Sequence, residues 1–345
     1  MMKRKKGQST LPALLAGALL LVGCWFAWRY VSDNKLPNFR HETVVFVRPG
    51  TSADEVYAEL VRNAGVRRPY SLDRAFKSKK VTSYIKPGRY EVKPSHTSVY
   101  VARMLNNCWQ TPCNLVLSGT LRQKDQIASR ISSQLMIDSA QVMSALNDKA
   151  LLARFGFTPS NVFSLFIPDT YEMYWTAGIE ELLSRQKQAY DEFWTKERRA
   201  KAKAQGLSIK EVSVLASIVK GETNFEPEMP KIAGVYLNRL RAGMKLQACP
   251  TIAYCLDYKT NRILLRDLEI DSPYNTYRHA GLPPGPIAVP TKANLDAVLN
   301  PEGNYLFFCA NSDFSGTHLF ARTYSEHQKN AKAYQKALDK RKGNS

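Results

Sequence analysis

The chain has 345 residues, of which 44% are hydrophobic and 23% are charged, as is ordinary for globular proteins. This composition excludes a collagen-like chain, a wholly disordered chain and a protein with many membrane spans, and the length favours two or three domains. Lys and Arg outnumber Asp and Glu by 49 to 30, and the net charge of +19 suggests a polyanionic partner: nucleic acid, anionic lipid or an acidic wall polymer.

An apolar stretch near the N-terminus predicts a transmembrane helix over residues 11–31. Residues 11–28 carry no charge, and at about 1.5 Å per residue they nearly cross a hydrocarbon core of roughly 30 Å. Trp25 and Trp28 suit the aromatic belt at a membrane surface. A basic cluster within residues 1–10 predicts that this tail is cytoplasmic and that the chain after the span is exported.

Two other interpretations of the apolar stretch compete with an uncleaved, single-pass anchor. A cleaved signal peptide would have a shorter apolar core and an A-x-A-like site, which the sequence lacks. Residues 21–24 have the form of a lipobox, which leaves lipid attachment at Cys24 open, although Trp25 and its neighbours continue the apolar run. Because the basic surface would then be exported and no nucleic-acid-binding motif is present, nucleic acid is not an expected partner.

Five of the six cysteines follow the predicted span, in a compartment where disulfides persist. Their spacing allows two local disulfides, Cys108 with Cys113 and Cys249 with Cys255, and leaves Cys309 over. Neither pair has C-x-x-C spacing and the five histidines are scattered, so no metal site is expected.

The exported chain is predicted to begin with a polar stalk at residues 32–42 and a small αβ module at residues 43–117. Strand-like runs at residues 43–47, 90–92 and 115–117 are each followed by a turn and an amphipathic helical pattern. Such a module is either a binding module or an ordinary scaffold.

Residues 118–335 are predicted to form a second, larger α+β domain, followed by a basic tail at residues 336–345. Residues 118–157 and 178–204 have mostly helical patterns, and an apolar strand precedes the turn at residues 166–172. The fold class expected for the whole exported chain is therefore α+β.

Glu222 is the strongest candidate for chemistry. A capping box at Ser208–Glu211 opens a helix whose apolar residues recur at helical spacing and which should end near Gly221. Glu222 would then lie at the negative end of the helix beside an apolar face, where the macrodipole and burial both raise the pKa of a carboxyl group. A carboxylic acid that keeps its proton near neutral pH suits general-acid cleavage of a glycoside. The alternative is an exposed helix-end residue without function.

Loops rich in polar and aromatic groups follow a second predicted helix at residues 229–242. Gln247, Tyr254, Asn275 and Tyr277 are candidates for orienting sugars, because rings and amides suit the apolar faces and hydroxyls of a glycan. Each of them taken singly is more often a structural residue.

Several motifs occur in order along the second half of the chain. They are Pro168-Asp169-Thr170-Tyr171, Leu215-Ala216-Ser217-Ile218-Val219-Lys220-Gly221-Glu222-Thr223, Val235-Tyr236-Leu237-Asn238-Arg239-Leu240, Met244-Lys245-Leu246-Gln247, Pro250-Thr251 with Tyr254, Tyr274-Asn275-Thr276-Tyr277, Gly281-Leu282-Pro283-Pro284-Gly285-Pro286-Ile287, His318-Leu319-Phe320 and Glu326-His327. With the N-terminal anchor, this set resembles the signature of the membrane-anchored endolytic murein transglycosylases, the YceG-like family, over nearly the whole chain.

The resemblance implies a plasma-membrane anchor in a bacterium, a LysM-like peptidoglycan-binding module and a catalytic domain with one essential glutamate, which falls on Glu222. It implies endolytic cleavage of the MurNAc–GlcNAc β-1,4 bond in nascent glycan strands, with a 1,6-anhydro-MurNAc end. That reaction would terminate strand elongation beside peptidoglycan synthases. No cofactor is implied. Two departures from the family pattern are Lys220, where an acidic residue is common, and Cys249, where Asp is common.

A single carboxyl group suffices for this reaction, because the 6-hydroxyl of the sugar is the nucleophile, whereas ordinary glycosidases need two carboxylates. One alternative is a muramidase that uses water, with Asp257, Asp267 or Asp271 as second carboxylate. Another is a non-catalytic wall-binding scaffold that recruits synthases.

Overall fold

The computed structural model describes residues 11–81, 85–260 and 262–343. The chain divides into two compact units: unit 1 is residues 1–113 with 172–176, and unit 2 is residues 114–171 with 177–345. Within the described ranges, helices accompany three two-stranded sheets, β1–β2, β3–β4 and β5–β6. The predicted mixed class of helix and strand is confirmed, whereas the LysM-like character of the module stays a prediction.

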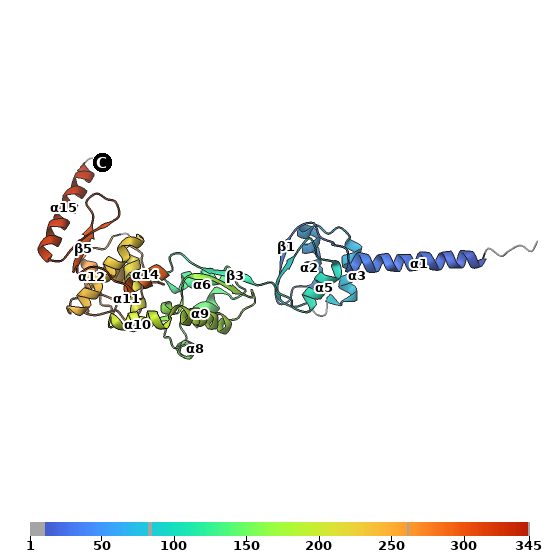
Figure 1. Cartoon of the computed structure of the whole chain (residues 1–345), viewed down its shortest axis with the longest axis horizontal. Coiled ribbons are helices and arrows are strands. Elements are labelled where there is room, and N and C mark those ends of the chain that lie inside the picture. Colours follow the sequence, from blue (N-terminus) through green and yellow to red (C-terminus); the bar gives the residue numbers. More distant parts are fainter. Residues whose placement is uncertain (1–10, 82–84, 261, 344–345) are drawn as a thin grey trace, which may run out of the picture. The chain divides into compact units, whose positions relative to one another are not determined.

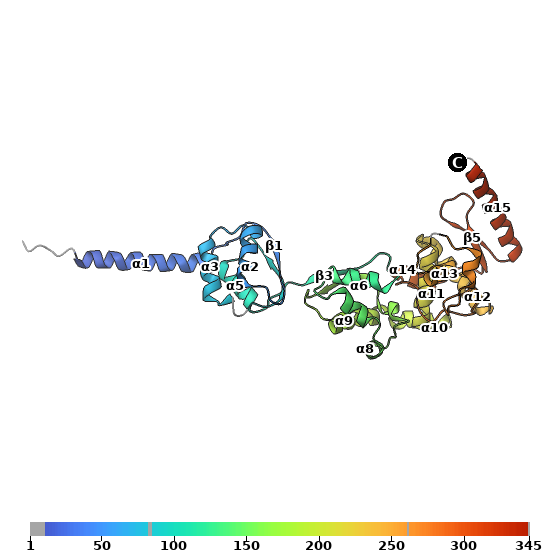
Figure 2. The ribbon, with the colours of Figure 1, turned by 180° about the vertical axis from the view of Figure 1, so that it is seen from behind.

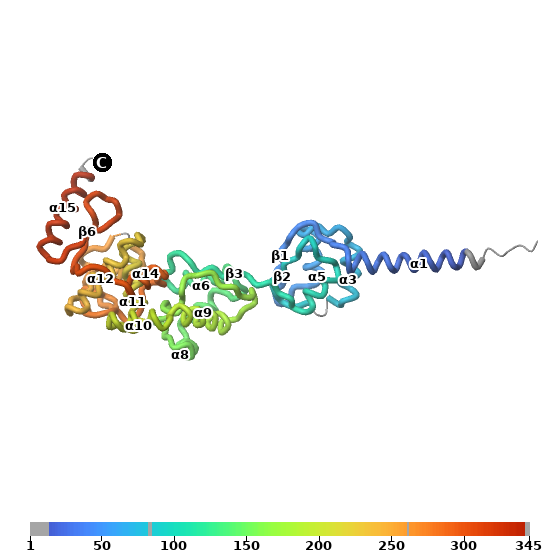
Figure 3. The backbone as a smooth tube through the Cα atoms, viewed as in Figure 1, coloured from blue at the N-terminus to red at the C-terminus, as the bar shows by residue number. Residues whose placement is uncertain are grey.

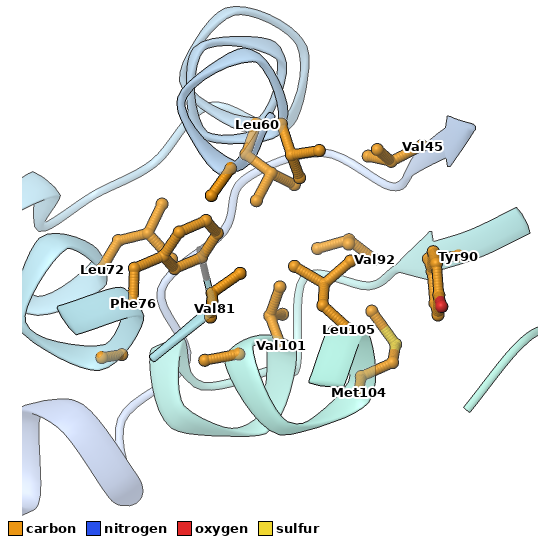
Figure 4. Close-up of a cluster of buried hydrophobic side chains, with 14 of the residues drawn as sticks. Val45, Leu60, Leu72, Phe76, Val81, Tyr90, Val92, Val101, Met104 and Leu105 are labelled. Carbon is orange, nitrogen blue, oxygen red and sulfur yellow. The ribbon is translucent and has the colours of Figure 1, made fainter. Parts of the chain in front are cut away.

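Unit 1 has its own core between a two-stranded sheet and three helical segments (Figure 1). Its elements are α1 (Leu11–Asn34), β1 (Thr43–Val47), α2 (Ala53–Glu59), a π-helical turn (Leu60–Ala64), α3 (Pro69–Ser78), β2 (Gly88–Val92) and α5 (Ser98–Asn106). The strands pair antiparallel, with Thr43 opposite Val92 and Val47 opposite Gly88. In the core, Leu60, Leu72 and Leu105 point toward one another from separate elements (Figure 4). Burying each such side chain contributes about 1.5–3 kcal/mol.

Helix α1 contains the one segment of the described chain, Leu14–Asn34, that is long and apolar enough to cross a membrane. The sequence predicts a stalk over residues 32–42, but the structure differs, because α1 continues to Asn34 and packs against α3 and α5. Phe39 is fully buried in the core of unit 1, and the buried Asn38 side chain donates to Ser98 Oγ at 2.8 Å. This segment is therefore part of unit 1, where the buried Phe39 ring and the hydrogen bonds of Asn38 hold it.

Unit 2 is mainly helical, and Figure 2 shows its helices from behind. Its first elements are β3 (Cys113–Leu117), α6 (Lys124–Ser132), α7 (Ser139–Ala145), α8 (Lys149–Arg154), a 3₁₀ turn (Val162–Leu165), β4 (Asp169–Met173), α9 (Ile179–Phe193) and α10 (Lys196–Ala204). The later ones are α11 (Ile209–Glu222), a 3₁₀ turn (Glu226–Glu228), α12 (Met229–Arg241), α13 (Cys249–Cys255), a 3₁₀ turn (Leu265–Glu269), α14 (Lys292–Leu299), β5 (Phe307–Ala310), β6 (His318–Ala321) and α15 (Tyr324–Gly343).

Helix α11 is the central helix of unit 2. It packs against α12, α13 and α14, and every residue from Val212 to Val219 is buried. The sequence predicts an amphipathic helix here, but partners on several sides bury both faces. Ser217, which would be costly to bury unpaired, donates to the Val214 carbonyl at 2.6 Å and accepts from the Ile287 N–H at 3.0 Å.

The C-terminal part of unit 2 is a hairpin with a helix against it. Strands β5 and β6 pair antiparallel, with Phe307 opposite Ala321, and α15 packs on both of them (Figure 3). The region predicted as a basic tail, residues 336–345, is helical as far as Gly343.

Candidate active site

The C-terminal end of α11 carries Glu222. The predicted capping box begins the helix: Ser208 Oγ accepts from the Glu211 N–H, and the Glu211 side chain accepts from the Ser208 N–H. Glu222 is the last helical residue, one past the predicted end. Gly221 before it has no room for a side chain, because a Cβ there would lie 2.4 Å from Pro250 Cβ. The last turn of α11 is therefore held directly against α13.

The Glu222 side chain is partly buried, and its carboxyl group is hydrogen-bonded. The Tyr236 hydroxyl on α12 donates to Glu222 Oε1 at 2.5 Å. Burial raises the pKa of Glu222, and this outweighs the Tyr236 hydrogen bond and the charges of His318 and Arg239, which lower the pKa. The group thus keeps its proton to a higher pH than an ordinary glutamate, as a general acid requires.

Two side chains with positive charge or the capacity for it, Arg239 and His318, lie close enough to Glu222 to act on its pKa. Arg239 is buried, with its guanidinium donating to the carbonyls of Leu306 at 2.7 Å and Leu246 at 2.6 Å. His318 on β6 bonds to the buried Glu228 twice: its backbone N–H donates to Oε1 at 2.8 Å, and its Nδ1 lies 2.9 Å from Oε2. Both oxygens of the Glu228 carboxylate therefore contact His318.

Two loops are tied together next to Glu222 by Thr276. The Gln247 N–H donates to the Thr276 carbonyl at 3.1 Å, and the Ala248 N–H donates to Thr276 Oγ1 at 3.0 Å. This connection brings Cys249 Sγ to 3.1 Å from the Tyr277 hydroxyl. Burial raises the pKa of the Cys249 thiol, and the nearby Glu222 carboxylate raises it further, as it also does for Tyr277.

The four residues predicted to orient sugars lie in different settings. Gln247 is exposed, with a left-handed φ of 50°, and Tyr277 is partly exposed near Glu222. Tyr254 lies at the far end of α13, where its ring contacts that of Tyr274 at a tilt of 41° with 4.6 Å between centroids, and it lines a separate cavity of about 480 Å³.

Asn275 is fully buried, which leaves its side chain no exposed surface to offer a sugar. Its amide donates to the carbonyls of Leu268 and Ile270, both at 2.8 Å, and its Oδ1 accepts from the Tyr277 N–H at 2.9 Å. Asn275 thus holds the loop that presents Tyr277.

The predicted disulfides are absent from the structure, whose six cysteines, all within the described ranges, are thiols. Cys249 and Cys255 are the two ends of α13, about 9 Å apart along the helix axis at about 1.5 Å per residue, which exceeds the reach of a disulfide. The Cys108 thiol instead accepts a hydrogen bond from Gln110 Nε2 at 3.4 Å.

Lys220, one of the two departures from the family pattern, is held by backbone carbonyl groups. Its ammonium donates to the carbonyls of Val289 at 2.8 Å and Gly119 at 3.2 Å. Burial lowers the pKa of Lys220 to about 8, and the charge of Arg122 lowers it as well. The lysine ties the end of α11 to two segments distant in sequence.

Sequence reasoning missed Tyr236, Arg239 and the Glu228–His318 pair as parts of the site. Tyr236 and Arg239 occupy buried positions of α12, where a helical pattern predicts only core packing. The available signal was a tyrosine and an arginine three residues apart on an otherwise apolar face. In the part of the chain that the structure describes, no group of three or more His, Cys, Asp or Glu residues could hold a metal ion.

A partly buried carboxyl group at the end of a central helix, with a raised pKa and a hydrogen bond from a tyrosine hydroxyl, defines a candidate general-acid site in an α+β protein. A model of the YceG-like family matches residues 45–333. The chain therefore belongs to the YceG-like family.

Proteins similar to this chain include an endolytic murein transglycosylase of Bacillus subtilis, 32% identical over an alignment of 231 residues that covers 61% of this chain and 62% of that protein. One of Streptococcus pneumoniae serotype 2 is 26% identical over 348 residues, covering 91% of this chain and 62% of that protein. The match thus spans less than two thirds of either relative's length. A crystal structure of a yceG-like protein from Listeria monocytogenes is 28% identical, with a TM-score of 0.53, covering 84% of this chain and 99% of that one.

Proposed function

We propose that the chain is an endolytic peptidoglycan lytic transglycosylase, a lyase that cleaves the MurNAc–GlcNAc β-1,4 bond in nascent glycan strands. The observation that carries the proposal is the Glu222 carboxyl group, whose pKa burial raises and whose partner is the Tyr236 hydroxyl. Membership of the YceG-like family and the names of the relatives support the same activity.

Glu222 would serve first as acid and then as base. Its carboxyl proton goes to the glycosidic oxygen, so that the C1–O4 bond breaks and GlcNAc leaves with a new 4-hydroxyl. The MurNAc 6-hydroxyl then bonds to C1 and closes the 1,6-anhydro ring. The Glu222 carboxylate takes the 6-hydroxyl proton, which restores the starting acid. Tyr236 stabilises the carboxylate between the two transfers through its hydrogen bond.

The positions of the other acids favour this reaction over a water-using muramidase. Asp257 pairs with Lys259 at 3.1 Å, and Asp271 is an exposed residue that pairs with Arg278 at 3.4 Å. Asp267 accepts from the Leu264 N–H at 2.7 Å. Each candidate for a second carboxylate is thus engaged with a local partner.

The remaining proposals concern position in the cell envelope. We propose that α1 anchors the chain once in the plasma membrane, with the N-terminus cytoplasmic and unit 2 outside, where the glycan is. Residues 43–117 would be a LysM-like peptidoglycan-binding module and residues 118–335 the catalytic domain. Termination of strand elongation would place the enzyme beside peptidoglycan synthases. The apolar span and the basic N-terminal cluster support this orientation.

Product analysis tests the proposed reaction. Full-length protein acting on uncrosslinked glycan strands should release fragments with 1,6-anhydro ends in mass spectra, and reducing ends would show a muramidase instead. Glu222→Gln should lower the rate by about 10³-fold, since a general acid contributes about 10²–10⁴-fold. Glu302→Gln, which changes an exposed carboxylate of unit 2, is the matched control and should leave the rate unchanged. Equal release by Glu222→Gln and the parent would favour a role as scaffold.

A further inference from the structure

A cavity of about 620 Å³ lies where the end of α1 meets the start of α3, inside unit 1. Two tryptophans and four arginines dominate its lining: Trp25, Trp28, Arg29, Arg67, Arg68 and Arg74. Figure 1 shows α1 running directly to α3 at this point. Nothing in the proposed glycan chemistry uses this cavity, which belongs to the unit that does not contain Glu222.

The cavity has an excess of positive charge. Arg74 forms an ion pair with Asp33 at 2.6 Å, and it is the only one of the four arginines that pairs with a carboxylate in the described chain. Arg68 donates to the carbonyls of Leu36 and Pro37 at 3.1 and 2.8 Å, which leaves its charge uncompensated. Its Nε is also buried without a hydrogen-bond partner among the described residues.

The other two arginines carry charge toward solvent. Arg67 is exposed, and among the described residues its side chain donates only through Nε, to the Phe39 carbonyl at 3.2 Å. The guanidinium of Arg29 lies 4.4 Å from the centroid of the Trp25 ring, a cation–π contact that keeps it beside an aromatic face. Four guanidinium groups thus line one cavity against a single carboxylate of the described chain, Asp33, which pairs with Arg74 and also interacts with the charge of Arg29.

The apolar surface next to this charge indicates what fills the cavity. The residues of α1 that precede it, including Leu19, Leu20 and Leu21, are 69–74% exposed, and no other part of the described chain covers them. Trp25 and Trp28 mark the level at which such a helix leaves the hydrocarbon. Guanidinium groups bind phosphate oxygens in a bidentate manner. The exposed apolar surface of α1, which is long enough to contact lipid acyl chains, therefore adjoins the guanidinium groups of the cavity.

We propose that this cavity binds the phosphate headgroup of an anionic phospholipid, whose acyl chains lie along the apolar face of α1. The inference rests on the proposed membrane anchor but not on the proposed glycan cleavage. Binding of this kind would hold unit 1 against the outer leaflet. A free phosphate ion has the same charge but no acyl chains, so it would gain nothing from the exposed face of α1.

Native mass spectrometry of the full-length chain, released from micelles that contain equal amounts of phosphatidylglycerol and phosphatidylcholine, tests the proposal. We expect retained phosphatidylglycerol to exceed phosphatidylcholine by about 10-fold or more, because each basic residue near a membrane surface contributes appreciably. The double variant Arg29→Gln/Arg67→Gln should reduce this preference by about 10-fold. Its thermal unfolding midpoint, measured in parallel, should stay within about 2 °C of the parent, as expected for partly exposed side chains.

The control variant Arg40→Gln/Arg62→Gln removes two exposed charges from unit 1 outside the cavity and should retain the preference. Equal retention of the two lipids, or equal loss in both double variants, would overturn the proposal. If 10 mM inorganic phosphate displaced all of the bound phosphatidylglycerol, the site would be one for a free anion, and the proposal of a lipid site would also be overturned.

These experiments distinguish failure of the lipid site from failure of the proposed glycan cleavage or of the proposed membrane anchor. Glu222→Gln should bind lipid like the parent, because Glu222 lies in unit 2. Failure of the chain to insert into bilayers would overturn the anchor and the lipid site together. Insertion and glycan cleavage without lipid preference would overturn the lipid site alone.

Discussion

The protonation state of Glu222 results from opposing influences at the scale of single residues. Burial raises its pKa, whereas the Tyr236 hydroxyl, His318 and Arg239 lower it, with burial the largest effect. A group that must first give a proton and then take one back needs a pKa near the working pH, and such opposition is a way to reach it.

Tyr236→Phe removes the hydrogen bond to the carboxylate, so the pKa of Glu222 should rise. Because the proposed acid works in its protonated form, activity falls as pH rises through that pKa. The alkaline limb of the pH–rate profile should therefore move upward, by about one pH unit for a hydrogen bond to a charged group. Measuring kcat/KM for glycan release from pH 4 to 9 checks this.

Tyr190→Phe is the matched control, since the buried Tyr190 hydroxyl has no hydrogen-bond partner among the described residues. Its pH profile should coincide with that of the parent. A downward shift of the limb in Tyr236→Phe would contradict the assignment of the titration to Glu222.

Lys220→Glu restores an acidic residue at the position where the family pattern often has one. In this chain the new carboxylate would face the carbonyl oxygens of Gly119 and Val289, which now accept from the Lys220 ammonium. We expect a loss of about 1–3 kcal/mol in the free energy of unfolding, measured by urea denaturation, because the two carbonyl oxygens would lose their donor, while the nearby charge of Arg122 would offset part of this cost. Lys203→Glu, at an exposed position of α10, should cost less than about 0.5 kcal/mol. Equal effects would show that the site at Lys220 tolerates either sign of charge.

At the scale of elements, the contact between α11 and α13 sets the position of the proposed acid. A Cβ at Gly221 would meet Pro250 Cβ at 2.4 Å and Cγ at 2.7 Å, so the Gly221 backbone lies directly against the Pro250 ring. Pro250 is also buried, with little freedom to move aside.

Gly221→Ala should therefore push α13 away and displace Glu222 from Cys249 and Tyr277. A displacement of about 1 Å at a catalytic group costs about 10²-fold in rate, and we expect kcat for glycan release to fall by that factor. Gly178→Ala, where a Cβ meets nothing within 4 Å, is the control and should leave kcat unchanged. Unchanged kcat in Gly221→Ala would mean that the helices separate without moving the acid.

Elements with strong local signals were predictable from the sequence. The capping box at Ser208 and the glycine at 221 bracket α11 to within one residue, and Met229–Arg241 follows from its helical pattern. Helix α13 was missed because its start, Cys249-Pro250, reads as a loop, although proline is favoured in the first turn of a helix. The packing of residues 35–42 was missed because one buried phenylalanine, Phe39, leaves no periodic pattern.

The candidate site was predictable only in part, for a related reason. Glu222 follows from a single helix end, which is local information. The contacts of Tyr236 and His318 depend on how α12 and the β5–β6 hairpin pack against α11, and such tertiary contacts have no signature within one window of sequence. Asn275 was predicted to orient sugars, but it is buried and holds its loop. The prediction failed because a buried polar residue in a loop and an exposed one look alike in sequence.

At the scale of the whole molecule, the two units have separate cores and should unfold separately. Leu60→Ala in unit 1 and Leu215→Ala in unit 2 each remove a fully buried side chain. Each substitution should cost about 2–5 kcal/mol and lower only the thermal transition of its own unit. Differential scanning calorimetry of the full chain should show two transitions, of which each variant moves one. A single transition that both variants shift equally would show that the units unfold as one.

The continuous helix from α1 into unit 1 has a geometric consequence if α1 spans the bilayer as proposed. Since no linker separates them, the number of helical residues determines both the height and the azimuth of unit 1 relative to the membrane. One residue inserted between Val31 and Ser32 would raise the unit by about 1.5 Å and rotate it by about 100°. A span of this kind would act as a spacer of fixed length and fixed rotation, and its register would determine which face of unit 1 points away from the membrane.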